Sequence, residues 1–479
     1  MSDTRRHLTI ALLAILIALP TGTAFAWKFA SIADSQGSDN GVSTGVLTTI
    51  VNQIKAENVD LVILSGDLVS GATDITLHNY MYDTWLGVMN QLNCPWYVVP
   101  GNHDINDNAA CEAAFVAKTN MPMNGPAGYK GTVYSFDHNN AHFVGLNSNH
   151  PGMGGTIGSV ELSWLATDLA NTTQPHIFTF CHQPPYDPYP TGGLSDRDTL
   201  WSAIGKAGVM MSFCGHIHYF KRTQCGDVMQ VINSSVGGEL VTGVPGTVAA
   251  YNYLLVSIDG NKVHCEAKYD TGVTFDTWEY TVLPNCGDAS SVPDATMPTL
   301  LVGKIVTKVR GTTCWVEDDK RSAACQCSAT PIPSVGDKVN ILGTFKTLTT
   351  GERELQGSAL VISSGNVPPK PVLMTVKTLL GGPEANTPGM PGAAGLNNYG
   401  LLVKVAGKVT AVGTGADAGY YYIDDGSGIK DGTSWDGKEN AGVRIKSGDT
   451  LSKGAMATVT GVVSIFKNGS QLCRMLYCG

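Results

Sequence analysis

The sequence predicts a layered α/β domain followed by two small all-β barrel domains. Up to about residue 220, short apolar strand patterns alternate with amphipathic helix patterns. Beyond residue 228 the patterns are those of strands and turns alone. The length agrees with several domains, because 479 residues are more than one domain of about 150 residues usually contains.

The elements of the amino-terminal part follow one another in a regular order. Strands are expected over residues 27–33, 60–65, 96–99, 176–180 and 209–213, with a β-hairpin over 134–146. Helices are expected over residues 43–57, 78–92, 159–170 and 197–206, the first of them opened by Ser43 as its N-cap. Strands that alternate with helices imply a parallel or mixed sheet.

The amino terminus and the cysteines indicate an exported protein. Arg5 and Arg6 precede an apolar run and small residues that end at Ala26, which is typical of a secretory signal peptide over residues 1–26. An uncleaved anchor is the alternative, although the apolar run is shorter than the roughly 20 residues that span a bilayer. All twelve cysteines follow this segment, so disulfides are expected. The predicted location is secreted, periplasmic or cell-surface, with no later membrane-spanning segment.

Metal-ligating residue types follow five of the expected strands. The carboxyl ends of strands in an α/β sheet are where ligands bind, so these residues are expected to meet. A single His or Asp at the start of a loop is more often a cap or a solvated residue, and only the joint occurrence indicates a site. The residues are Asp34, Gly66-Asp67, Gly101-Asn102-His103-Asp104, His182 and Gly215-His216-Ile217-His218.

This set of side chains suits two metal ions. Ions roughly 3.5 to 4 Å apart need a carboxylate between them and hard or borderline ligands on either side. Asp67 is the expected bridge, and Asp34 and His218 would complete the site of one ion. The second ion would be held by Asn102, His182 and His216.

These motifs resemble those of the calcineurin-like metallophosphoesterases. The first motif, Asp34-x-Gln36, and the four that follow it match the family in order over about residues 27–283. The resemblance implies a four-layer α/β/β/α sandwich of two mixed sheets flanked by helices. Within the family, the segments 134–137 and 181–186 are most similar to the acid-phosphatase-type branch.

The resemblance also implies an activity. It points to a metal-dependent phosphatase or phosphodiesterase that hydrolyses small phosphate mono- or diesters by attack of a metal-bound hydroxide. The cofactors would be two divalent or trivalent metal ions, Mn, Fe, Zn or Mg, and His103 would protonate the leaving oxygen. The implied ligands are Asp34, Gln36, Asp67, Asn102, His182, His216 and His218.

The first motif departs from the family pattern. Most members have Asp-x-His there, and Gln36 stands in place of that His. An amide carbonyl can ligate a hard cation, but it binds borderline metals more weakly than imidazole does. An alternative function is therefore an exported binding or scaffold protein with a degenerate metal domain. The retained His103 argues for the enzyme, because a scaffold needs no general acid.

The predicted catalytic domain covers residues 27–286 and is followed by a repeated β unit. A linker over 287–298 leads to a first β domain over 299–378, and a Gly- and Pro-rich linker over 379–400 leads to a second over 401–479. Both copies resemble OB-fold-like barrels, which can bind oligonucleotides or oligosaccharides. Nucleic-acid binding is not expected, because the net charge is −9 and no basic run occurs. A structural role, or contact with a cell surface or polysaccharide, is the prediction.

Overall fold

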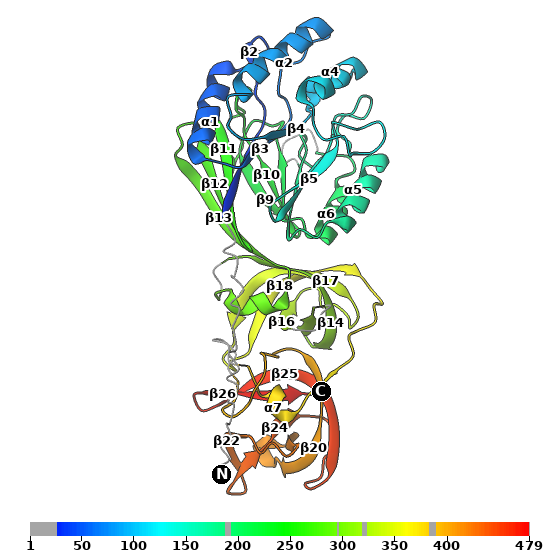
Figure 1. Cartoon of the computed structure of the whole chain (residues 1–479), viewed down its shortest axis with the longest axis vertical. Coiled ribbons are helices and arrows are strands. Elements are labelled where there is room, and N and C mark those ends of the chain that lie inside the picture. Colours follow the sequence, from blue (N-terminus) through cyan, green and yellow to red (C-terminus); the bar gives the residue numbers. More distant parts are fainter. Residues whose placement is uncertain (1–25, 187–192, 295–296, 319–322, 383–388, 479) are drawn as a thin grey trace, which may run out of the picture.

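The computed structural model describes residues 26–186, 193–294, 297–318, 323–382 and 389–478. The predicted signal peptide lies outside the described residues, apart from Ala26. Figure 1 shows an elongated molecule with the α/β domain at one end and the β tail at the other. No helix in the described ranges is long and apolar enough to cross a membrane.

The α/β domain contains two mixed sheets. The first has the order β13-β12-β11-β1-β3-β4, in which β1, β3 and β4 are parallel and β11 to β13 are antiparallel. Its strands are β1 (Trp27–Ile32), β3 (Leu61–Ser65), β4 (Trp96–Val99), β11 (Asn252–Asp259), β12 (Lys262–Tyr269) and β13 (Thr274–Leu283). The second sheet is ordered β5 (Tyr134–His138), β6 (Ala141–Gly145), β7 (His176–Phe180), β8 (Met211–Cys214), β10 (Val228–Ile232) and β9 (Lys221–Cys225).

Helices cover the outer faces of both sheets. The first sheet is covered by α1 (Thr44–Glu57), α2 (Ile75–Met89) and α4 (Ala109–Thr119), and the second by α5 (Ser159–Asn171) and α6 (Arg197–Ala207) (Figure 1). Between the sheets the buried ring of Phe29 meets Phe143, Phe178 and Phe213 at centroid distances of 5.1, 5.2 and 5.9 Å. These layers confirm the expected four-layer sandwich.

Three local expectations need correction. The helix expected from residue 78 begins at Ile75, because the side chain of Asp74 accepts hydrogen bonds from two backbone N–H groups of its first turn. Ser43 occupies the N-cap position of α1 but makes no side-chain capping bond. Helix α4 was not expected, although its buried residues Cys111, Ala114 and Phe115 have the i, i+3, i+4 spacing of an amphipathic helix.

The tail consists of two rings of strands with the same order. The first tail domain is built from β14 (Thr299–Arg310), β15 (Thr313–Glu317), β16 (Ala324–Ala329), β17 (Lys338–Thr347) and β18 (Arg353–Ser363). The second contains β20 (Leu402–Val412), β21 (Tyr420–Asp424), β24 (Val443–Lys446), β25 (Met456–Asn468) and β26 (Gln471–Tyr477). In each ring the first strand pairs with both the second and the fourth, which closes the ring. An all-β tail is therefore confirmed.

The first tail domain continues a sheet of the α/β domain. Strand β14 pairs in parallel with β13, from Thr281 opposite Thr299 to Leu283 opposite Leu301. The segment expected as a linker over 287–298 includes most of the 3-10 helix η1 (Cys286–Ser291), whose buried residues join the core of the first tail domain. The boundaries of the domains themselves stay predictions.

Candidate metal centre

The predicted ligands lie on loops whose backbone is unusual for non-glycine residues. Asp34, Asp67, His216 and His218 have φ angles of 62°, 52°, 75° and 57°. This left-handed region costs an L-residue roughly 1 to 2 kcal/mol, and such residues cluster at functional sites. The fold therefore holds four predicted ligands in a conformation that the chain would not adopt for stability alone.

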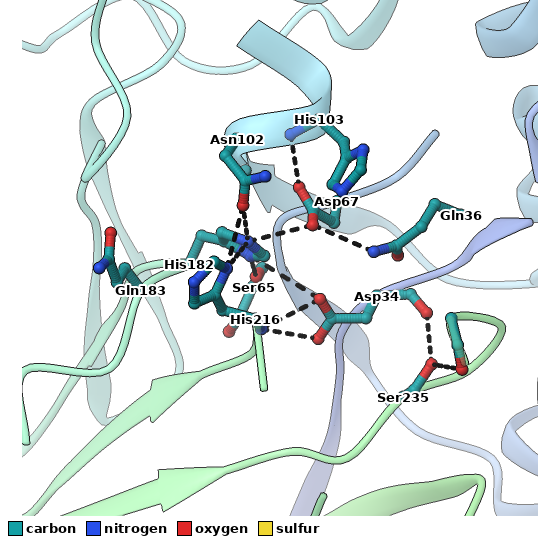
Figure 2. A network of polar contacts seen from close by, with 12 residues as sticks. Asp34, Gln36, Ser65, Asp67, Asn102, His103, His182, Gln183, His216 and Ser235 are labelled. Carbon is teal, nitrogen blue, oxygen red and sulfur yellow. Dashed lines mark hydrogen bonds and ion pairs between the residues drawn. The ribbon is translucent and has the colours of Figure 1, made fainter. Parts of the chain in front are cut away.

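One group of ligand atoms forms around His182. Its Nε2 lies 3.2 Å from Oδ2 of Asp67, 3.0 Å from Oδ1 of Asn102 and 3.2 Å from Nδ1 of His216. Figure 2 shows these four side chains turned toward one another from different loops. This is the set that the sequence predicts for the second ion.

A second group forms beside the first. Nε2 of His218 lies 3.4 Å from Oδ1 of Asp34. Together with Asp67 these two residues present ligand atoms that all lie within 4.8 Å of one another, and the same holds for Asp67, His182 and His216. Asp67 belongs to both groups, as expected of a carboxylate that bridges two ions.

Backbone carbonyls orient two of the imidazoles. Nδ1 of His182 lies 2.8 Å from the carbonyl oxygen of Ser65, and Nδ1 of His218 lies 2.7 Å from that of Glu239. Since a carbonyl only accepts, both rings carry their proton on Nδ1 when neutral and present the Nε2 lone pair to the cluster. Metal-binding histidines are commonly held in this way.

Two glycines allow the ligands to converge. A Cβ on Gly101 would lie 2.1 Å from Oδ1 of Asp67, and a Cβ on Gly215 would lie 2.4 Å from Oδ2 of Asp34. Both glycines therefore provide the space that these carboxylates occupy. Donor types, shared carboxylate and ring orientation all fit a centre for two cations.

Burial and neighbouring charges shift the pKa values of the cluster in both directions. Burial opposes a proton on His182, but the carboxylate of Asp67 outweighs it and raises the pKa of His182 to about 10. Burial and the neighbouring His182 lower the pKa of His216 to about 4. Burial also raises the pKa of Asp34, even though His218 pulls it down. Two cations would take the place of these protons as partners of the carboxylates.

Gln36 is turned with its amide nitrogen toward the cluster. Its Nε2 lies 3.1 Å from Oδ2 of Asp67 and 3.1 Å from Nε2 of His218, while its buried Oε1 has no hydrogen-bond partner among the described residues. A half-turn of the amide would place Oε1 where Nε2 now lies, facing both ligand groups. Gln36 is thus at the position of a ligand, and its role as one stays a prediction.

His103 lies at the edge of the cluster. Its backbone N–H donates to Oδ1 of Asp67 at 2.9 Å, and Nδ1 of its ring lies 2.9 Å from the carbonyl oxygen of Ser70. Figure 2 places the ring beside Asp67. The ring therefore keeps Nε2 available for a proton transfer.

Asp104 supports the cluster from beneath, a role not assigned to it from the sequence. Its buried carboxylate accepts hydrogen bonds from the N–H groups of Gly101 and Leu68 and from the hydroxyl of Tyr82. Burial and the neighbouring Asp67 raise the pKa of Asp104 to about 7. Asp104 fixes the loop of Asn102 and His103 onto the loop of Asp67.

A cavity of about 300 Å³ adjoins the cluster at Asn102. We call it the side cavity; its lining residues are Asn102, Asp107, Asn149, Gly152 and Gly154. The last three lie on the loop between β6 and α5. No metal-ligand pattern marks this loop, so sequence reasoning did not assign it to the site.

Comparison with known proteins agrees with this geometry. Residues 28–220 match the family model described as calcineurin-like phosphoesterase. The chain is 27% identical over 175 residues to a probable cyclic nucleotide phosphodiesterase of Psychrobacter sp., covering 35% of this chain and 50% of that protein. It is 28% identical over 211 residues to purple acid phosphatase 21 of Arabidopsis thaliana, covering 41% of this chain and 45% of that protein.

A third relative is a probable glycerophosphodiester phosphodiesterase of Arcobacter nitrofigilis, 26% identical over 184 residues, with 36% of this chain and 61% of that protein covered. Among solved structures, a purple acid phosphatase from seeds of yellow lupin (Lupinus luteus) matches with 16% identity and a TM-score of 0.45 over 54% of each chain. The chain spans about half the length of the first curated relatives it matches.

The protein contains an α/β sandwich, and a cluster of ligand residues suited to two metal ions lies at the ends of its strands. The amino-terminal part of the chain is a calcineurin-like phosphoesterase domain, as the motifs predicted. The relatives include purple acid phosphatases and phosphodiesterases alike, so they do not favour one branch.

Proposed function

We propose that the protein is an exported phosphoesterase that hydrolyses phosphate esters with two metal ions held by the predicted ligands. The observation that carries the proposal is the position of Asp67, whose carboxylate belongs to two adjoining groups of ligand atoms. Asp34, Gln36 and His218 would hold one ion, and Asn102, His182 and His216 the other. The family supports the class of reaction, and the ligand geometry supports a binuclear centre.

In this proposal the chain positions the ester and moves one proton. Two bound cations would supply an activated water and neutralise charge on the phosphoryl oxygens. Asp67 and the orienting carbonyls of Ser65 and Glu239 hold the ligand atoms in place. His103, anchored at Nδ1 on Ser70, donates a proton from Nε2 to the departing oxygen.

The test is a side-by-side assay of a phosphate monoester and a diester with Mn, Zn, Fe and Mg. The metal-depleted protein should have no activity, and at least one of these metals should restore turnover of at least one ester. Absence of turnover with every metal would instead favour a binding or scaffold protein with a degenerate metal domain. This alternative is motivated by Gln36, which stands where most family members have His.

We also propose that the chain is exported and that its cysteines pair. No thiols of the described residues lie at bonding distance, but Cys314 and Cys327 are directly opposite on β15 and β16. Cys286 and Cys325 lie in the same core, where Sγ of Cys325 is 3.8 Å from the carbonyl oxygen of Cys286, and the sulfurs of Cys181 and Cys214 are 3.9 Å apart. Mass spectrometry of the protein secreted under oxidising conditions should identify these peptides as linked, and free thiols at all of them would contradict the proposal.

For the tail we propose two OB-like barrels with a structural or surface-contact role. The closed five-strand order shared by both rings supports the barrel class. A polysaccharide or a cell surface is the favoured partner. Single-stranded nucleic acid is not favoured, because the sequence has no run of basic residues that could line a binding groove. Binding of the isolated secreted protein to cell-wall polysaccharide, with single-stranded DNA as comparison, tests this role.

A further inference from the structure

The loops around the ligand cluster share an unusual lack of positive charge. The sequence has no Lys or Arg between residues 29 and 54, 56 and 117, 131 and 196, or 207 and 220. These four segments carry all seven ligand candidates, His103 and the whole side cavity. A site that binds the two negative charges of a phosphate monoester commonly uses an Arg or Lys for this purpose.

Two of the basic residues that flank these segments are engaged by other groups. Lys118 pairs with Asp83, and the guanidinium of Arg197 lies 5.1 Å from the ring centre of Tyr186 and 3.4 Å from Asp198. The four segments therefore supply no Lys or Arg to the phosphate, and its charge would be compensated mainly by the metal ions.

The side cavity adds a negative charge and neutral polar groups. The carboxylate of Asp107 lies on its wall and accepts a hydrogen bond from the N–H of Gly152 at 2.6 Å. Asn149 is buried, and its Oδ1 accepts a hydrogen bond from the hydroxyl of Ser148 at 2.8 Å, so its amide offers N–H donors. Asn102 joins this cavity to the ligand cluster.

We propose that this site takes phosphodiesters in preference to monoesters, with an uncharged polar substituent of the phosphate lying in the side cavity. The inference rests on the proposed function and specifies its substrate class. A monoester carries a charge of about −1.5 to −2 at neutral pH, whereas a diester carries one negative charge. The carboxylate of Asp107 repels the additional charge, and a hydroxyl-bearing group can donate to Asp107 and accept from Asn149.

Hydrolysis of such a diester breaks one P–O bond and adds the elements of water. The proton of the attacking water is released, the departing alcohol takes up a proton, and a monoester remains. That product carries the additional charge which the site disfavours. It should therefore leave and accumulate instead of being hydrolysed again.

The test compares three esters that share one leaving group: p-nitrophenyl phosphate, methyl p-nitrophenyl phosphate and thymidine 5′-p-nitrophenyl phosphate. With the metal-loaded full chain, kcat/KM should rise in this order, and the methyl diester should exceed the monoester by about tenfold. Thymidine 5′-monophosphate should accumulate as the product of the third ester.

Two variants connect the preference to the side cavity. Asp107→Asn keeps the shape and tolerates the φ of 49° at this position, and it should raise kcat/KM for the monoester by about threefold relative to the methyl diester. Asn149→Leu should reduce the advantage of the thymidine diester over the methyl diester. Asp436→Asn, in the second tail domain and also at a positive φ, makes the same change in net charge and should leave all ratios unchanged.

The outcomes separate this inference from the proposed function. Turnover of none of the three esters would contradict the proposed function. Turnover in which the monoester equals or exceeds the diesters would leave that function standing and overturn the substrate class. Unchanged ratios in both Asp107→Asn and Asn149→Leu would also overturn it, because the side cavity would then have no part in selection.

Discussion

Two regions of the molecule use the left-handed backbone in opposite ways. At the ligand cluster it is occupied by Asp34, Asp67, His216 and His218, whereas at the junction with the first tail domain it is occupied by Gly208 and Gly303. Glycine adopts this conformation without steric cost, and the other residues do not. The cluster therefore keeps functional side chains at a cost in stability. The junction instead has glycines, which avoid that cost but carry no side chain.

The polar contacts of the two regions differ in the same way. The cluster crowds buried carboxylates and imidazoles and leaves Oε1 of Gln36 without a partner among the described residues. At the junction, buried Asn340 donates to the carbonyl oxygens of Gly205 and Lys206 and accepts from the N–H of Gly303. Changes at the cluster should therefore affect chemistry, and changes at the junction should affect folding.

The largest expected effect is that of Asp67→Asn. Loss of the shared carboxylate charge should lower activity by about a thousandfold or more, equivalent to roughly 4 kcal/mol, and reduce the bound metal below two ions per chain. Metal analysis and steady-state kinetics measure both effects. A variant that keeps full activity and two metals would show that Asp67 is not the bridge.

His103→Ala should preserve the metal content and slow the reaction by about a hundredfold for esters with basic leaving groups. The effect should shrink for good leaving groups such as p-nitrophenol, because these depart without a proton. A series of aryl and alkyl esters measures this trend. Equal slowing across the series would remove His103 from the role of acid.

At the junction, Asn340→Leu should lower the free energy of unfolding by about 2 to 3 kcal/mol, because two carbonyls and one N–H lose their partner. The kcat of the folded enzyme should change little. Ser358→Ala is the matched control, since it removes only an exposed hydrogen bond to Asp227 and should cost less than about 0.5 kcal/mol. Denaturant unfolding followed by fluorescence compares the two variants, and equal stabilities would contradict the structural role of Asn340.

The smallest effect in this series is expected from Gln36→His. Imidazole is the better ligand for borderline metals, so binding of Zn or Fe should tighten on the order of tenfold, about 1.4 kcal/mol, and binding of Mg or Mn should change less. Parallel metal titrations and rates of both forms measure this. If the unmodified protein is active and the substitution changes its affinity for none of the metals, Gln36 is not a ligand. If only the Gln36→His variant is active, the metal site of the unmodified protein has decayed.

Much of the α/β domain and the grouping of the ligand candidates were predictable, because both follow from local patterns. Strand ends are readable in the sequence, and the topology brings the ends of β1, β3, β4, β7 and β8 together. The left-handed φ of Asp67 was not predictable, since only contacts from distant loops hold it. The same is true of buried Asp104, of Asn149 in a loop without a motif, and of the pairing of β13 with β14 across an expected linker.

The most direct measurement of the central claim is a metal titration of the chelator-treated protein with simultaneous assay of ester hydrolysis. Activity should be absent without metal, rise with added Mn, Zn, Fe or Mg, and reach its plateau at two ions per chain. The Asp67→Asn variant should show neither the plateau nor the activity. Full hydrolysis by protein free of metal, or stoichiometric binding of two ions with no hydrolysis of either mono- or diesters, would contradict a two-metal phosphoesterase.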